Sequence, residues 1–243
     1  MSPRVRSAIC LLLSAHTGLV CATGVQPEST VIFISESDGI AQMAVRNTED
    51  IPMLLNVEVI ELTGDSTIGI FAMPSVARIE PGGNQLVRFS MQKPAVPLSV
   101  QHMKRVAFEG IPGLDTRHSS FANSQVRINV RQIIPVIISP AALEQDIEPW
   151  KRLTASIAGP RFIEISNPSP FVVRLQSGLS GGPGTGIRIS DLQDTYILPS
   201  QKIRVAYRKD DPLQAFSSIT INPASPWGYM AAPYDIPVSV SQP

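Results

Sequence analysis

The stretch Ser124–Ser139, SQVRINVRQIIPVIIS, decides the fold class. Val126, Ile128 and Val130 alternate with polar residues, a period of two that places three branched apolar side chains on one face of a β-strand. Five of the seven residues in 133–139 are Ile or Val, so this half is predicted to be buried on both faces. An ordinary half-exposed strand is one interpretation. The other is a strand whose far end enters a core and whose near end offers a hydrophobic edge.

Short apolar runs separated by turn residues continue along the whole chain. In the first half, strands are predicted at Thr30–Ile34, Ile40–Arg46, Pro52–Leu62, Ala77–Ile79, Gln85–Met91 and Lys104–Glu109. After a linker at Pro140–Pro149 with room for one helical turn, strands are predicted at Phe162–Ser166, Phe171–Leu175, Ile187–Ile189, Thr195–Leu198, Ile203–Tyr207, Ser218–Ile221 and Ile236–Val240. This spacing predicts an all-β protein of two antiparallel sandwiches, with domains at 23–139 and 140–243.

The N-terminus has the pattern of a secretory signal peptide. Arg4 and Arg6 precede the apolar run Ala8–Leu13, and small residues favour cleavage after Ala22. The apolar run is too short to span a membrane. We therefore expect an exported protein that loses its first 22 residues.

Composition excludes several classes of function. Both cysteines, Cys10 and Cys21, lie in the signal peptide, so the mature chain is expected to have no disulfide and no thiolate site. A lipid anchor through Cys21 is a weaker alternative, because Val20 is bulky where a lipobox needs a small residue. Without Arg4 and Arg6, 18 basic residues face 20 acidic ones, and no basic stripe is visible. Nucleic-acid binding is therefore not expected.

No motif in the chain indicates catalysis. The Gly-rich run Ser180–Gly186 lacks the Lys-Ser/Thr of a phosphate-binding loop, so a hairpin or long loop is favoured. His102 and His118 are predicted in polar loops without partners at metal-ligand spacing. There is no G-x-S-x-G elbow and no distinct carboxylate pair. We expect a protein that is not an enzyme, with no catalytic residues, no metal, no cofactor and no small-molecule substrate.

Several motifs, taken in order, resemble a known family. They are Val76–Gly83 (VARIEPGG), Gln85–Phe89 (QLVRF), Arg105–Pro112 (RVAFEGIP), Ile165–Val173 (ISNPSPFVV) and Leu198–Ser200 (LPS). Over nearly the whole mature chain, this pattern is similar to the periplasmic chaperones of the chaperone–usher pilus pathway, the PapD-like superfamily, and within it to the archaic or alternative branch.

The resemblance implies two immunoglobulin-like sandwiches arranged as a boomerang. It also implies that the chain folds and caps pilus or fimbrial subunits in the periplasm and delivers them to an outer-membrane usher. A subunit that lacks its last strand would receive the stretch carrying Val126, Ile128 and Val130 in donor-strand complementation.

The resemblance is incomplete at the expected carboxylate anchor. Better-known members carry an Arg and a Lys at positions that align near Val31 and with Pro135, so both cations are missing here. The resemblance to the archaic or alternative branch implies Arg105 as the anchor, with Lys104 and Arg131 as rivals. A solvent-facing strand arginine is the competing interpretation of Arg105.

Two other classes of protein remain as alternatives. A secreted β-sandwich could itself be a structural or adhesive subunit of a surface fibre, but such a subunit should look incomplete, whereas two complete sandwiches are predicted. A carbohydrate-active accessory domain should carry exposed aromatic platforms, and the chain contains 2 Trp and 4 Tyr.

Overall fold

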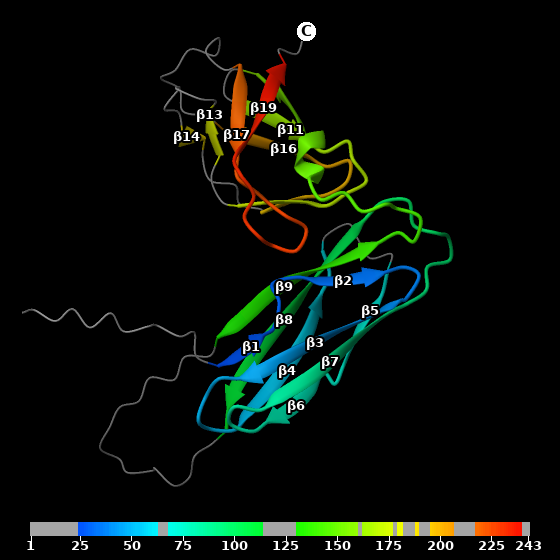
Figure 1. Cartoon of the computed structure of the whole chain (residues 1–243), viewed down its shortest axis with the longest axis vertical. Helices are drawn as coiled ribbons and strands as arrows, with labels where there is room; N and C mark the ends of the chain where they lie inside the picture. The colour runs from blue at the N-terminus through cyan, green and yellow to red at the C-terminus, as the bar shows by residue number, and fades with distance from the viewer. Residues whose placement is uncertain are drawn as a thin grey trace, which may run out of the picture.

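The computed structural model describes residues 24–62, 68–113, 130–159, 162–176, 179–181, 188–189, 195–206 and 217–239. They form two β-sandwiches, which confirms the all-β prediction, and the two lie end to end at an angle (Figure 1), as the family resemblance implied. Within these residues, no helix has the length and apolarity that crossing a membrane requires.

The first sandwich packs a sheet of order β1-β3-β7-β5 against a sheet of order β2-β9-β8-β4-β6. Its strands are β1 (Val25–Pro27), β2 (Ile32–Ser35), β3 (Ile40–Asn47), β4 (Met53–Ile60), β5 (Ile70–Met73), β6 (Val76–Ile79), β7 (Asn84–Met91), β8 (His102–Pro112) and β9 (Arg131–Ser139). The predicted strands from Ile40 to Glu109 are all present within a few residues of their predicted bounds.

Two strands of this sandwich were not predicted. β1 is only three residues long and ends in Pro27, so it has no readable period. β5 has the sequence IFAM, in which even the exposed positions Phe71 and Met73 are apolar, so its sequence shows no alternation of polar and apolar residues. The strand predicted at Thr30–Ile34 begins at Ile32, because the preceding chain joins the opposite sheet as β1.

Alternation of side chains builds the first core. In β4, Met53, Leu55 and Val57 are buried while Leu54 is exposed, as a period of two requires. Phe89 and Phe108 meet edge to face across the two sheets, with ring centroids 6.3 Å apart. Fully burying each large apolar side chain contributes about 1.5–3 kcal/mol.

The second half of the stretch that decided the fold class forms β9. Its residues 134–138 are buried, as predicted, but Ile133 is 52% exposed, so burial on both faces begins one residue later than expected. Ile134, Val136 and Ile138 belong to the first core, whereas Ile137 faces the second sandwich.

The second sandwich packs a sheet of order β14-β13-β17-β19-β10-β11-β16 against the three-stranded sheet β15-β12-β18. Its strands are β10 (Thr154–Ile157), β11 (Phe162–Ser166), β12 (Val173–Leu175), β13 (Leu179–Gly181), β14 (Arg188–Ile189), β15 (Tyr196–Ile197), β16 (Lys202–Ala206), β17 (Ser218–Ile221), β18 (Pro223–Ala224) and β19 (Tyr234–Ser239). The short strands β10, β13 and β18 were not predicted. The helical turn expected in the linker lies at its end, as the 3-10 helix η2 (Pro149–Arg152), with Pro at its start.

A buried amide closes one end of the second sandwich. Asn167 is 0% exposed, and its Nδ2 donates to the carbonyl oxygens of Phe171 (2.7 Å), Ile197 (3.0 Å) and Leu198 (3.1 Å). Its Oδ1 accepts from the backbone N–H and the hydroxyl of Ser169. One side chain therefore joins the segment that enters β12 to the end of β15.

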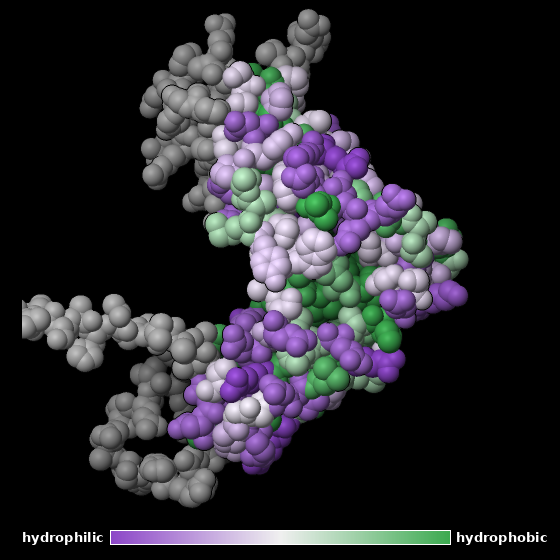
Figure 2. All heavy atoms as spheres, viewed as in Figure 1, coloured by the Kyte–Doolittle hydropathy of each residue, from purple (hydrophilic) through white to green (hydrophobic). Residues whose placement is uncertain are grey.

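The two sandwiches share a small apolar cluster. Val31, Met103 and Ile137 of the first sandwich pack with Val172 and Tyr196 of the second. Figure 2 shows hydrophobic residues gathered where the two lobes meet. In this contact, the face of β8 and β9 that carries Met103 and Ile137 packs against the three-stranded sheet.

Gln101 adds polar links at the same junction. Its backbone N–H donates to the Pro170 carbonyl at 2.8 Å, and its Oε1 accepts from the Val172 N–H at 2.8 Å. Its Nε2 also donates to the Ser139 hydroxyl at 3.3 Å. A single residue at the start of β8 thereby connects the end of β9 to the segment that enters β12.

Candidate functional site

The strand β9 has one edge that is only partly covered. β8 pairs with it from Arg131 to Ile138, whereas β2 covers its other edge only from Val136 to Ser139. Along residues 131–135, no strand among the described residues pairs on the β2 side. Pro135, which cannot donate a backbone hydrogen bond, lies within this open edge, where proline is tolerated.

The side of β9 that faces the first core continues into the apolar side of the predicted donor strand. Side chains two residues apart share a face, so Ile134 and Val136 share theirs with Val130. Val130 is half-buried and lies beside Gly24. Val126 and Ile128 lie outside the described residues, so their role stays a prediction.

The three candidate cations occupy different environments. Lys104 is completely buried and pairs with Glu61, whose side chain is 52% exposed. Arg131 is 43% exposed and donates to Glu58 at 2.6 Å. Arg105 is half-buried and lies opposite Pro135 in the β8–β9 register.

Arg105 shares the face of β8 that meets the second sandwich. It follows Met103 by two residues, so the two side chains point to the same side, and Met103 packs in the shared apolar cluster. Burial raises the pKa of the Tyr196 phenol, while the positive charges of Arg174 and Arg105 act to lower it. Arg105 therefore lies on the face of β8 whose Met103 packs with Tyr196 of the second sandwich. The sequence motifs did not single out Arg174 or Tyr196, because only the fold brings them to Arg105.

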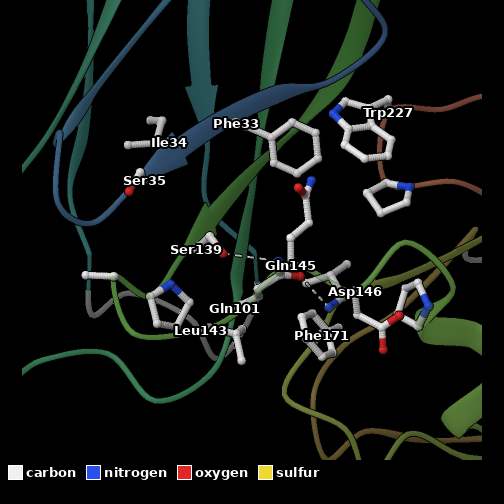
Figure 3. Close-up of a pocket in the computed structure, with 15 residues that line it drawn as sticks. Phe33, Ile34, Ser35, Gln101, Ser139, Leu143, Gln145, Asp146, Phe171 and Trp227 are labelled. Carbon is white, nitrogen blue, oxygen red and sulfur yellow. Dashed lines mark hydrogen bonds between the residues drawn. The ribbon is translucent and has the colours of Figure 1, made fainter.

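A pocket of about 400 Å³ lies at the same junction. Figure 3 shows Phe33 and Trp227 on one side of it and Leu143 and Phe171 on the other, with Gln101 between them. These groups come from both sandwiches, so the pocket depends on how the sandwiches are joined.

The described residues contain no group of His, Cys, Asp and Glu side chains that could hold a metal ion. The placement of His102 in a polar loop is wrong, because it begins β8 and lies opposite Ile138. The sequence pattern missed this pairing because residues 101–103 lack a period. His118 and residues 182–186 of the Gly-rich run lie outside the described residues.

The fold and the open strand edge define a two-sandwich protein that can extend a sheet of another chain. Comparisons with known proteins agree with this class. Residues 24–144 match the family described as pili and flagellar-assembly chaperone, PapD N-terminal domain. The fimbrial chaperone YhcA of Escherichia coli K12 is 35% identical over 214 residues, which cover 88% of this chain and 90% of that protein. The chain therefore belongs to the periplasmic family of pilus-assembly chaperones.

Solved structures show the same fold. The Escherichia coli chaperone DraB matches with a TM-score of 0.68 at 17% identity, covering 89% of this chain and 97% of DraB. The Salmonella enterica structure of the SafA pilin with the SafB chaperone matches with a TM-score of 0.68 at 18% identity, covering 89% of this chain and 97% of the matched chain. The alternative of a fibre subunit is not favoured by these findings.

Proposed function

We propose that this chaperone caps a pilus or fimbrial subunit by donor-strand complementation and delivers it to an outer-membrane usher. The open edge of β9 at residues 131–135 carries this proposal, because no strand in the described part of the chain pairs there on the β2 side and the edge lies beside an apolar face. The membership in the pilus-chaperone family supports the same partner class.

In this mechanism the subunit groove receives the stretch that precedes β9. Backbone hydrogen bonds along the open edge supply affinity, and Val126, Ile128 and Val130 fill successive pockets. Each buried side chain contributes about 1.5–3 kcal/mol of transfer free energy. Since every contact is non-covalent, the donor strand of another subunit can replace this stretch in the groove without a nucleotide or a catalytic step. We infer that the protein is not an enzyme.

Arg105 is the proposed anchor for the terminal carboxylate of the subunit. A carboxylate loses water on binding and needs a charge-assisted partner, which also sets the register of the added strand. Lys104 is less suited because its side chain is enclosed and paired with Glu61. Arg131 is less suited because it already binds Glu58 and lies farther along β9 from the second sandwich.

We also propose the processing and the domain limits. Residues 1–22 would act as a removed signal peptide that brings the chain to the periplasm. The domains would cover residues 23–139 and 140–243, which is supported by separate apolar cores in the two sandwiches. The assignment to the archaic or alternative branch stays a prediction.

The proposed donor strand can be tested by recovering tagged protein from the periplasm of its source. We compare the wild type with Ile128→Asp, and use Asn129→Asp as the matched control. Both variants add one negative charge, but the alternation places the two positions on opposite faces.

The wild type and Asn129→Asp are expected to recover one small β-rich subunit in equal proportion, whereas Ile128→Asp loses it. Circular dichroism of each variant confirms that it is folded. Equal recovery by both variants would contradict the assignment of the donor strand. If the wild type recovers no subunit while pilins are being expressed, the proposed function is wrong.

A further inference from the structure

Arg174 of the second sandwich extends toward the first. It lies in β12, opposite Tyr196 in the β12–β15 register, and its guanidinium carbon lies 5.7 Å from the centre of the Tyr196 ring. Its Nη1 lies 3.5 Å from the Thr30 hydroxyl oxygen, just before β2 begins. The side chain therefore crosses the junction and places a positive charge beside the end of the open β9 edge.

The backbone at Gly228 lies close to the side chain of Arg174. Gly228 has φ +89°, and a Cβ atom there would lie 2.5 Å from Arg174 Nη1 and 2.5 Å from the Thr30 hydroxyl oxygen. Only a residue without a side chain can approach the guanidinium this closely. Arg174 is thus held between an aromatic ring, a hydroxyl and a backbone segment, which restricts its conformations before any ligand binds.

No carboxylate of the described residues forms an ion pair with Arg174, in contrast to Arg131, Arg152 and Arg204. Among the described residues, the aromatic ring and a long hydroxyl contact leave most of its five N–H donors for another acceptor. On the first sandwich, Arg105 lies two residues from Met103 on the same face of β8, and Met103 packs with Tyr196 in the shared apolar cluster. We call Arg105, Arg174 and Tyr196 the junction cluster.

We propose that Arg174 and Tyr196 complete the carboxylate-binding site together with Arg105, so that both domains hold the C-terminus of the bound subunit. This inference rests on the proposed function. A guanidinium fork matches the two oxygens of a carboxylate, and a phenol donates one further hydrogen bond. Because the three groups come from β8, β12 and β15, the bound carboxylate would also bind the two sandwiches to each other.

The test measures the preference for a free carboxylate. The probes are two synthetic peptides with the last fifteen residues of the subunit that the wild-type chaperone recovers, one a free acid and one a C-terminal amide. Calorimetric titration gives the ratio of their dissociation constants for the wild type, Arg174→Gln, Tyr196→Phe and Arg105→Gln. Arg204→Gln is the matched control, because Arg204 is an exposed arginine of the same sandwich that pairs with Glu164.

The wild type and Arg204→Gln are expected to prefer the acid by roughly tenfold to a hundredfold, the range of hydrogen bonds to charged groups. Arg174→Gln should lower this preference by about tenfold, and Tyr196→Phe by a smaller factor, while amide binding stays unchanged. If Arg174→Gln weakens the acid and the amide equally, Arg174 has only a structural role and the proposal is overturned. An unchanged preference overturns it too. Failure of the wild type to bind either peptide or the whole subunit would instead refute the proposed function.

Discussion

Replacing Asn167 by Ala should strongly destabilise the second sandwich. The amide is 0% exposed, and its two N–H donors serve three carbonyl oxygens while its oxygen accepts two hydrogen bonds. Counting two donated and two accepted bonds at about 1 kcal/mol each predicts a loss of roughly 4 kcal/mol. This is a large fraction of the 5–15 kcal/mol that is typical of a folded domain.

Tryptophan fluorescence during urea unfolding can isolate this effect. The chain has 2 tryptophans, both in its second half, and Trp150 is 5% exposed in the second core. With a urea dependence of about 2 kcal/mol per molar, the unfolding midpoint should fall by roughly 2 M.

Asn47→Ala is the matched control. Asn47 is also 0% exposed, and its Nδ2 donates to Ile51, Ile79 and Glu80 carbonyls in the first sandwich. This variant should shift the circular-dichroism transition more than the fluorescence transition. A fluorescence midpoint for Asn167→Ala within about 0.3 M of the wild type would refute the hydrogen-bond argument, given the same urea dependence.

Three further predictions follow, two on the junction and one on the stability of the fold. Gly228→Ala should lower the preference of the chaperone for the acid peptide several-fold, because the new methyl group displaces Arg174, whereas Gly39→Ala, also at positive φ but without neighbours, should not. Gln101→Ala should loosen the link between the sandwiches, seen as a larger radius of gyration in solution scattering; an unchanged radius would argue against this role. Two backbone N–H groups hold the pKa of Glu36 below its usual 4.5, so the carboxylate stabilises the fold above that pH and loses this effect as pH falls through the lowered pKa. The melting temperature of Glu36→Ala should therefore lie below the wild-type value near neutral pH and converge with it in acid.

Much of the fold could be predicted from the sequence because many strands show a local alternation of apolar and polar residues. The period of two in β4 and the apolar run of β9 both follow from neighbouring residues, and the strands formed where those patterns indicated. The strands that were missed, such as β1, β10 and β18, have two to four residues and depend on pairing with distant segments. Local sequence carries little information about such pairing.

The features of the candidate site also divide into those that local sequence predicts and those that only folding brings together. The sequence by itself predicted the apolar donor face and showed the family resemblance, because both depend on residue types at fixed spacing. Only the tertiary structure decided that β2 leaves residues 131–135 of β9 open and that Lys104 is enclosed. It alone brought Arg174 beside Thr30, since 144 positions separate them along the chain. A charge can act on a distant residue only after folding has brought the two together, so this part of the site could not be predicted from sequence spacing.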